Sequence, residues 1–420
     1  MRDVFKLKGD KVIWILIVLF AMISIVAVFS SSSYLAAKRD VAKTAIFLEQ
    51  TRSVLLGFVA LFICYLIPLR AYRALSFIIF FFSVVMLIML YIPGMQDVRN
   101  GAVRGIKIFG VTFQVFEFAK IAVVLYLARA LELWDDSLYD FKTYALRILL
   151  PIAAVCLLIL PNSFSSALLI ALISFLIMFF MDMSWKNILI TVGIVAVALL
   201  LAFGTYHAFV KGKPTAELNG VEKIFNRFGT VEQRFENFMG DDQIDVNNLT
   251  PLEKEKLEDE QRQSNNAKVA ISQGGIFGKG PGKSTQRYSL SMAFSDFIYA
   301  FIVEEYGLLG GIVLITLYII FLFRCIRLCG RCKETFASVV VVGLSFLIAC
   351  QAFLHILVNV RLIPITGHTL PLISHGGTAY LVLSGAFGII LSVNKQLDKQ
   401  LAYERQQQKE LEESQLEENV

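Results

Sequence analysis

Long apolar runs divide this sequence and constrain its fold more than any other feature. Three of them are "VIWILIVLFAMISIVAVF" (12–29), "ALSFIIFFFSVVMLIMLYI" (74–92) and "ILITVGIVAVALLLAF" (188–203). A helix needs about 20 apolar residues to cross a bilayer, where only helices and closed barrels satisfy every backbone N–H and C=O. The composition agrees, because 56% of the 420 residues are hydrophobic and only 17% are charged. The sequence therefore predicts an all-α polytopic membrane protein.

Ten segments carry this pattern, although the shorter ones only approach the required length. They are residues 12–31, 45–67, 74–92, 114–133, 144–160, 165–182, 187–208, 295–323, 337–360 and 379–394. The first has no small-residue cleavage site and is expected to be an anchor rather than a signal peptide. We predict a transmembrane domain over 12–395, tails at 1–11 and 396–420, and one large loop at 209–294.

Lysine and arginine residues in the short segments between spans predict the orientation. They gather in the N-terminal tail and after the eighth span, as Arg2, Lys6, Lys8, Lys11, Arg324, Arg327, Arg331 and Lys333. An even number of spans separates the two groups, so both are expected in the cytoplasm, together with both termini. The loop 209–294 then lies outside the cytoplasmic membrane.

Charge and cysteine content limit the range of partners. The net charge of +5 is mild and indicates no nucleic-acid partner. Cys325, Cys329 and Cys332 have a spacing that some iron–sulfur enzymes use, but no fourth ligand is in reach. They are expected to be reduced thiols on a basic helix end.

The stretch "GGIFGKGPGKST" at 274–285 looks like a nucleotide-binding loop. A P-loop has the pattern G-x-x-x-x-G-K-[ST], but Phe277 stands where its first glycine belongs. The stretch is also expected on the outer side, so no nucleotide is expected to bind. Either it is a flexible, solvated loop, or its glycines bind a phosphate from the membrane, such as a lipid pyrophosphate, with Lys279, Lys283 and Arg287.

Two helices are predicted earlier in the long loop. Apolar residues three and four apart over 221–238 favour a helix lying flat in the membrane interface. In "TPLEKEKLEDEQRQ", Thr250 is a candidate N-cap, Pro251 takes the first helical position and Glu253 completes a capping box. This second segment is expected to be a short, exposed, charged helix.

Acidic residues mark the start of the eighth span, "FSDFIYAFIVEEYGLLGG". Asp296 is expected where the loop enters the span, with Glu304 and Glu305 about two turns further in and on different faces. A charge near the bilayer centre costs roughly 2.5–3.5 kcal/mol, so these glutamates are expected to face a polar cavity or cations. In the fourth span, Glu117 and Lys120 are predicted to form an internal ion pair.

Prolines and glycines interrupt "NVRLIPITGHTLPLISHGGTAYL", which follows the ninth span. Pro364, Pro371 and the pair 376–377 break helical regularity. Non-helical backbone at membrane depth is tolerated only against protein or along a water-filled cavity. The segment is therefore expected to be a re-entrant or outer loop packed on protein.

Three of these blocks, in this order, resemble the SEDS family (FtsW/RodA/SpoVE). They are "GGIFGKGPGKS", "SDFIYAFIVEEYGLLGG" and "LIPITGHTLPLISHGGT", and the resemblance extends over about 45–395. It is closer to the cell-division branch, FtsW, than to the elongation branch, RodA. The resemblance implies a peptidoglycan glycosyltransferase that polymerises lipid II at the outer face of the bacterial cytoplasmic membrane during cell division. It implies a class B penicillin-binding protein and other divisome proteins as partners.

The resemblance and the chemistry together assign roles to particular residues. The family's invariant aspartate corresponds to Asp296, which is expected to be catalytic. Residues expected to bind substrate are Arg104, Lys107, Lys279, Lys283, Arg287, Glu304, Thr366 and Ser374. Residues expected to be structural are Glu117, Lys120, Pro364, Gly367, Pro371, Gly376 and Gly377. No metal ligand is assigned, although a divalent cation, Mg²⁺ or Mn²⁺, is compatible with the chemistry.

The sequence departs from the family pattern at several positions. Gly105 stands where tryptophan is usual, and Ser163 replaces a frequent aspartate. Residues 115–116 replace proline–serine, and His355 and Arg361 occupy positions often held by asparagine and glycine. The departures leave the block around Asp296 unchanged.

One carboxylate is enough for the implied reaction. Its leaving group is a lipid pyrophosphate, which departs with charge neutralisation, whereas a glycosidase must protonate its leaving group. Asp296 is expected to be the general base for the acceptor 4-hydroxyl. Two other functions suit the same sequence: a lipid II flippase, because of the internal charges, and a divisome scaffold, because of the charged tail 396–420. Glycan product from labelled lipid II in detergent distinguishes an enzyme from both.

Overall fold

The computed structural model gives the fold of most of the chain. It describes residues 9–92, 94–99, 102–108, 111–134, 138, 140–181, 183–210, 229, 231–232, 234–235, 238–239, 251–290 and 292–418. The interfacial helix predicted over 221–238 lies largely outside the described residues, and so does the candidate cap Thr250.

Each predicted span coincides with a helix. The helices are α1 (Lys11–Ser31), α3 (Lys43–Leu66), α4 (Leu69–Met89), α5 (Val115–Trp134), α6 (Phe141–Tyr144) continued by η2 (Ala145–Leu149) and α7 (Leu150–Ile159), α8 (Phe164–Phe180), α9 (Trp185–Thr205), α12 (Ile298–Cys329), α13 (Thr335–Asn359) and α14 (Thr378–Glu418). Among the described residues, 8 helices are long and apolar enough to cross a membrane. Of the other two, α8 is only 17 residues long, and α5 is interrupted by charged side chains. The chain is thus a multi-pass helical membrane protein, as predicted.

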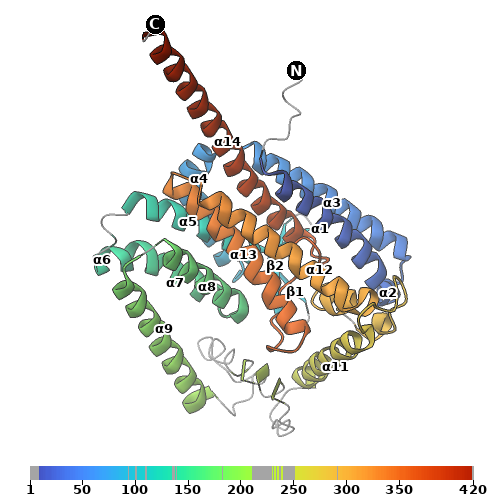
Figure 1. The fold of residues 1–420 in the computed structure, drawn as a ribbon. Coiled ribbons are helices and arrows are strands. Elements are labelled where there is room, and N and C mark those ends of the chain that lie inside the picture. The colour runs from blue at the N-terminus through green and yellow to red at the C-terminus, as the bar shows by residue number, and fades with distance from the viewer. Residues whose placement is uncertain are drawn as a thin grey trace.

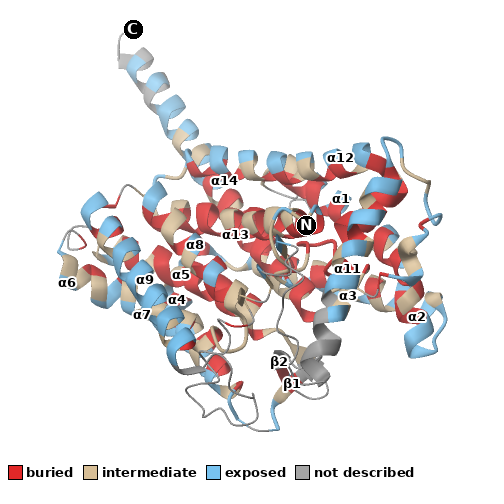
Figure 2. Ribbon diagram, turned by 90° about the horizontal axis from the view of Figure 1, so that it is seen from below, coloured by how far each residue is buried: buried red, intermediate tan, exposed pale blue. Residues whose placement is uncertain are grey.

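The helices form one bundle with a buried centre and an exposed edge. Figure 1 shows α1 beginning and α14 projecting at one end of the bundle, and α11 (Pro251–Gly274) at the other end. Buried residues concentrate in α13 and α5, whereas exposed residues line α9 (Figure 2). The contrast is large, because 78% of the apolar window of α13 is buried inside the protein and 11% of that of α9. The apolar surface of α9 therefore faces lipid rather than protein.

Small residues allow α3 and α14 to lie close together, as they do along much of their lengths. A Cβ on Gly57 would lie 2.6 Å from the ring of Tyr380, and a Cβ on Gly388 would lie 2.3 Å from the backbone oxygen of Leu61. Close backbone approach through small residues is a common way for helices to associate in membranes, where apolar burial alone gives little driving force.

A small sheet in the connection from α4 to α5 is the exception to the all-α prediction. Its antiparallel strands β1 (Gln96–Arg99), β2 (Ala102–Ile108) and β3 (Val111–Phe113) are hydrogen-bonded in that order. Gly105 lies in β2, and a Cβ there would be 2.2 Å from the backbone oxygen of Phe113. The glycine that replaces the family's usual tryptophan is therefore required by the backbone of β3.

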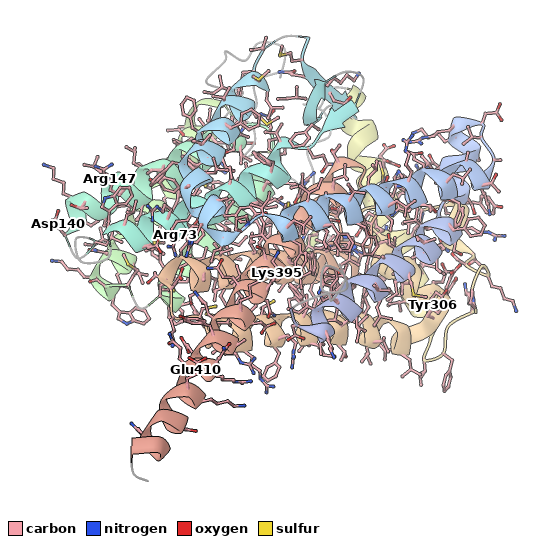
Figure 3. The ribbon with its side chains drawn as sticks, turned by 90° about the horizontal axis from the view of Figure 1, so that it is seen from above. Arg73, Asp140, Arg147, Tyr306, Lys395 and Glu410 are labelled. Carbon is pink, nitrogen blue, oxygen red and sulfur yellow. The ribbon has the colours of Figure 1, made fainter. Side chains whose placement is uncertain are left out.

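The helix α12 bends near its start. Gly307 has φ 71° and ψ −176°, a conformation that is essentially restricted to glycine. The first segment, 298–306, is hydrogen-bonded to Asn359 at the end of α13 and, through Glu305, to Ser30 at the end of α1. It therefore lies between the ends of α13 and α1, so Asp296, Glu304 and Glu305 do not belong to one straight span with the long part of α12, contrary to the prediction. Figure 3 shows Tyr306, the last residue before the bend, at the edge of the molecule.

The helix predicted from "TPLEKEKLEDEQRQ" is longer than expected. It begins at Pro251, as predicted, but α11 continues to Gly274. Its second half is not simply an exposed, charged surface, because Ala267 and Ala270 are buried in a small cluster with Phe297 and Phe301. The helix thus packs on the first segment of α12. A further short helix, α2 (Ser33–Arg39), follows α1.

Replacing Gly307 with alanine should destabilise the protein strongly. Its Cβ would lie 2.2 Å from the backbone oxygen of Ile276 and 2.4 Å from the backbone nitrogen of Gly278, in a backbone conformation that alanine avoids. We expect a loss of at least about 3 kcal/mol and a lower thermal unfolding temperature in detergent. Gly193→Ala is the matched control, since nothing lies within 4 Å of its Cβ position, and it should leave the temperature unchanged or slightly higher. Equal behaviour of the two variants would contradict the bend described here.

Candidate functional site

Asp296 lies in the turn that precedes α12. Phe297 is the N-cap residue and α12 begins at Ile298, so Asp296 is one residue outside the cap position. Only 9% of Asp296 is exposed. The aspartate is thus largely enclosed at the end of the bundle, and its position depends on what holds the turn.

Asn359, the last residue of α13, clamps this turn from one side. Its Nδ2 donates to the backbone oxygen of Asp296 at 3.0 Å, and its Oδ1 accepts from the backbone N–H of Ala300 at 2.9 Å. The same Nδ2 donates to the backbone oxygen of His355 at 2.8 Å. Asn359 is 1% exposed. A buried amide with all of these bonds fixes the Asp296 backbone relative to α13.

The loop 360–377 holds the turn from a second side. Ser374 donates its hydroxyl to the backbone oxygen of Ser295 at 2.8 Å and accepts from the backbone N–H of Leu370 at 2.8 Å. The backbone N–H of His375 donates to the oxygen of Phe294 at 2.9 Å. Ser374 is 3% exposed, and its hydrogen bonds position the turn that carries Asp296. Its contact with substrate stays a prediction.

A polar chain behind this loop was not found from the sequence. The His375 Nδ1 lies 2.8 Å from Gln50 Oε1, and the Gln50 amide donates to the hydroxyl of Ser24 at 2.8 Å. Ser24 in turn donates to the backbone oxygen of Ile373 at 2.8 Å. These contacts tie α1 and α3 to the loop that carries Ser374. No local motif marks the contacts that reach the loop, because their partners lie more than 300 residues apart along the chain.

The glycine stretch 274–285 is docked through defined backbone hydrogen bonds, although residues 275–277 and 281–283 are exposed to solvent. Backbone N–H groups of Lys279 and Gly280 donate to the backbone oxygens of Glu304 and Glu305 at 3.0 and 2.9 Å. In the other direction, the N–H of Leu308 donates to the oxygen of Gly275 at 2.9 Å. The loop therefore pairs with the backbone that the bend at Gly307 frees from helical hydrogen bonds.

The Glu304 carboxylate accepts hydrogen bonds from side chains and backbone of this loop. It is fully buried and accepts from the Lys279 ammonium at 2.8 Å, the Ser284 hydroxyl at 2.5 Å and the Thr285 N–H at 2.9 Å. Lys279 also donates to Gln273 at 2.5 Å and to the Thr285 hydroxyl at 2.6 Å. The ammonium has three donors, so all of them are engaged within the protein. The predicted pairing of the glutamate with a cation is confirmed, and direct substrate contact by Glu304 and Lys279 stays a prediction.

Glu305 points to the other side of the same segment, as the helical spacing predicts. It is 1% exposed and accepts from the Ser30 hydroxyl at 2.6 Å and from the backbone N–H of Gly282 at 3.0 Å. The two adjacent glutamates thus hold the glycine loop from both sides and join it to α1.

The remaining cations that are predicted to bind substrate differ in their exposure and in their partners within the protein. Lys283 is exposed and Lys107 has a 58% exposed side chain, with Asp97 at 3.7 Å. Arg287 donates to the backbone oxygen of Gly282 at 2.9 Å. Arg104 lies in β2, and its side chain is outside the described part of the structure. No distance between these cations and Asp296 is established, so their convergence on one substrate stays a prediction.

The ion pair predicted in the fourth span is present. Lys120 donates to Glu117 Oε1 at 2.7 Å and to Gln351 Oε1 at 2.9 Å, and its side chain is fully buried. Gln351 donates to the backbone oxygen of Thr369 at 3.2 Å. The pair therefore joins α5 and α13 to the loop 360–377. In that loop the hydroxyl of Thr366 is buried without a hydrogen-bond partner among the described residues.

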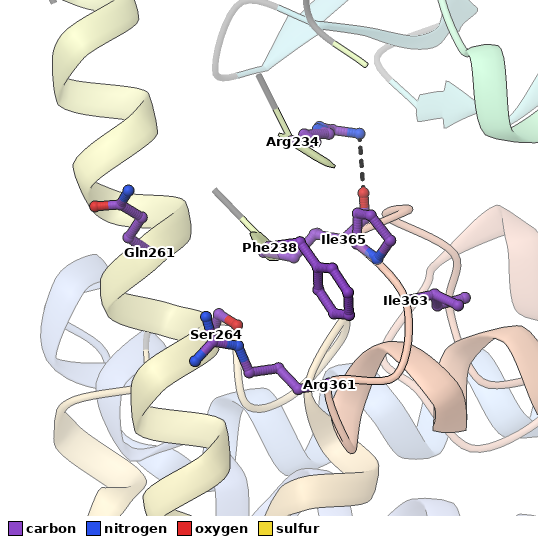
Figure 4. Close-up of a pocket in the computed structure, with 8 residues that line it drawn as sticks. Arg234, Phe238, Gln261, Ser264, Arg361, Ile363 and Ile365 are labelled. Carbon is purple, nitrogen blue, oxygen red and sulfur yellow. Dashed lines mark hydrogen bonds between the residues drawn. The ribbon is translucent and has the colours of Figure 1, made fainter. Parts of the chain in front are cut away.

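A small cavity lies beside this loop, between α11 and the segment 361–365 (Figure 4). Its volume is about 30 Å³, which suffices for roughly two or three waters and not for a sugar. Arg361 lies on its wall, with φ 58°, and donates to Asn265 at 3.0 Å. The arginine thus adopts the left-handed backbone that the family's usual glycine adopts without strain.

The side chains fit no metal centre made of protein ligands alone. Within the ranges that the structure describes, no three His, Cys, Asp or Glu residues gather closely enough to hold a metal ion.

Removing the Glu304 carboxylate should undock the glycine loop. Glu304→Ala leaves the partly exposed Lys279 ammonium, the buried Ser284 hydroxyl and the Thr285 N–H without their shared acceptor, at a cost of roughly 1–3 kcal/mol. We expect a lower unfolding temperature and faster proteolysis between residues 274 and 285. Glu258→Ala is the matched control, because that glutamate is exposed on α11. An undiminished unfolding temperature for Glu304→Ala, with normal loop protection, would show that the carboxylate is free for another role.

Comparison with known proteins supports the resemblance found in the sequence. A family model described as "Cell cycle protein", for the FtsW/RodA/SpoVE group, matches residues 10–399. A Bacillus subtilis (strain 168) protein called "Probable peptidoglycan glycosyltransferase FtsW" is 30% identical over 390 residues, which are 90% of this chain and 88% of the relative. A protein of the same description from Geobacter sp. (strain M18) is 24% identical over 92% of this chain and 97% of the relative.

Solved structures share the fold over nearly the whole chain. A chain from a study of "polymerization and crosslinking by a peptidoglycan synthase complex" has a TM-score of 0.65 at 22% identity, covering 92% of this chain and 98% of that one. The rod shape determining protein RodA of Thermus thermophilus has a TM-score of 0.61 at 21% identity, covering 93% and 98%. The match to the family model spans nearly all of the bundle, including the Asp296 turn and both loops that hold it. The chain therefore belongs to the FtsW/RodA/SpoVE family of cell cycle proteins.

Proposed function

We propose that this protein is a peptidoglycan glycosyltransferase that polymerises lipid II, with Asp296 as the general base. The observation that carries the proposal is the Asp296 turn itself. It stands in a family block and is anchored by backbone hydrogen bonds from α13 and from the loop 360–377. A catalytic base must be held within hydrogen-bond reach of the proton that it removes, and such anchoring provides that.

In this mechanism the 4-hydroxyl of the acceptor sugar loses its proton to the Asp296 carboxylate. The hydroxyl oxygen forms a bond to the anomeric carbon of the donor, and the bond from that carbon to the lipid pyrophosphate breaks. The pyrophosphate leaves as an anion, so no second carboxyl is needed to protonate it. Cations near its path would stabilise the charge that develops on it.

Lys283, Lys107 and Arg104 are the candidates for that neutralisation. The first two are exposed. Lys279 contributes indirectly, because its ammonium holds Glu304 and Thr285 and so fixes the loop on which Lys283 lies. Several backbone N–H groups of the glycine loop already donate to Glu304 and Glu305. If the loop binds a phosphate, it therefore does so mainly through its exposed side chains.

We further propose that the Asp296 end faces outward from a bacterial cytoplasmic membrane and that both termini are cytoplasmic. The charged part of α14 and the start of α1 lie at the opposite end of the bundle (Figure 1), where the positive-inside rule places the basic clusters. A class B penicillin-binding protein is the proposed partner. The similar solved chain from a peptidoglycan synthase complex supports this pairing.

Replacing Asp296 with asparagine should abolish polymerisation while preserving the fold. The amide keeps the shape and removes the base, and general base catalysis contributes roughly 10²–10⁴-fold to rate. The measurement is glycan formation from labelled lipid II by purified protein in detergent with its transpeptidase partner. Asp259→Asn, on the exposed side of α11, should retain the wild-type rate. Wild-type polymerisation by Asp296→Asn would refute the base, and a wild-type protein without any product would favour a flippase or a scaffold.

Asn359 should act as a positioning residue for Asp296. Asn359→Leu keeps a similar volume but removes the bonds to Asp296 and Ala300, so we expect kcat to fall about tenfold with little change in KM. Asn187→Leu is the matched control, since Asn187 is also 1% exposed and donates to a backbone oxygen, that of Leu138, at 2.9 Å. The two variants should lose similar stability. A purely structural role for Asn359 predicts the same kcat for both once the amount of folded protein is equalised.

A further inference from the structure

A second polar site lies at the end of the bundle opposite the glycine loop. There the end of α12 meets the start of α1 and the side of α14 around a half-open cavity of about 260 Å³. A water needs roughly 10–15 Å³ on this scale, so the cavity has room for a ligand much larger than water. Nothing in the proposed reaction uses it.

Cations dominate the wall of this cavity. They are Lys11 from α1 and Arg324, Arg327 and Arg331 from α12. The arginines recur at three- and four-residue steps, which places them along one side of a helix. The carboxylates on the wall are Asp10 and Asp398.

The charges are only partly balanced. Arg324 is paired with Asp10, through Nε at 2.8 Å and Nη2 at 2.5 Å. Arg327 lies over the ring of Phe323, 5.0 Å from its centroid, which orients its guanidinium. Lys11, Arg327 and Arg331 form no ion pair with any residue that the structure describes. The first eight residues of the sequence do not offset this excess, since they add Arg2, Lys6 and Lys8 against Asp3.

A buried amide forms part of the same wall. Asn394 of α14 is 5% exposed and lines the cavity. Its side chain makes no hydrogen bond within the described residues, so its amide is available to the cavity. Its neighbours Ser392 and Lys395, by contrast, donate to the backbone oxygens of Ile67 and Tyr65. An amide in this position can donate to an anion that the guanidinium groups attract.

We infer that this cavity binds a phosphate group, that of an anionic phospholipid or of a soluble phosphate ester. Guanidinium groups bind phosphate oxygens through paired N–H donors, and the cavity supplies two arginines without carboxylate partners. Its place at the ends of transmembrane helices is the level of lipid headgroups, where basic pockets between helices bind anionic lipids. The lipid source therefore fits both the charge and the location.

The test measures binding of a fluorescent short-chain phosphatidylglycerol to the purified full-length protein in neutral detergent, with the phosphatidylcholine analogue in parallel. The double variant Arg327→Gln, Arg331→Gln should bind phosphatidylglycerol about tenfold more weakly, and Asn394→Leu should also weaken it. The matched control is Arg405→Gln, on the exposed part of α14 beyond the cavity, which should bind like wild type. Thermal unfolding confirms that each variant is folded.

The outcomes separate the two phosphate sources. Binding that depends on Arg327 and Arg331 and resists millimolar glycerol phosphate supports a lipid headgroup. Binding that glycerol phosphate displaces supports a soluble phosphate ester in the same cavity. Equal affinity for both lipids, or wild-type affinity in the double variant, overturns the inference. Because the readout is binding, a failure of the proposed polymerase activity would not affect it.

Discussion

At Gly307 the chain passes through φ 71° and ψ −176°, and the outer end of the bundle is organised around that bend. A straight helix from Asp296 would carry Glu304 and Glu305 about 12 Å along its axis into the membrane. The bend instead lays the first segment between the ends of α13 and α1. It also exposes backbone groups that the glycine loop satisfies from Gly275 to Gly280. Buried charge and irregular backbone are thus accommodated in one place, where protein rather than lipid surrounds them.

The two adjacent glutamates and the candidate base Asp296 are held in different ways. Glu304 accepts from an ammonium, a hydroxyl and a backbone N–H, and Glu305 joins Ser30 to Gly282. The loop binds the Glu304 carboxylate through both of its oxygens and the Glu305 carboxylate through one, Oε1. Around Asp296 the hydrogen bonds go to the backbone instead. Asn359 donates to the backbone oxygen of Asp296, and Ser374 donates to that of Ser295. These bonds fix the Asp296 backbone relative to α13 and the loop 360–377.

The sequence was sufficient for features that depend on local pattern and insufficient for those that depend on distant contacts. The spans, the Glu117–Lys120 pair and the start of α11 at Pro251 follow from apolar length, i,i+3 spacing and capping chemistry. The bend was missed because a helical projection assumes a straight helix, and a single glycine in an apolar run does not reveal its backbone angles. The sheet was missed because its short strands lie in a connection. The clamp by Asn359 joins residues 59 and 63 positions apart, and no local motif marks such a contact.

The long part of α12 connects the two polar ends of the molecule. From Gly307 to Cys329 it extends about 33 Å. Displacement of α12 along or about its axis would therefore link the two ends mechanically. The ion pair of Arg324 with Asp10 fixes one end of that helix to α1, and the bond from Ser30 to Glu305 fixes its first segment to the other end of α1. Because the same helix is pinned to α1 at both ends, α1 and α12 are expected to move as one unit against the rest of the bundle.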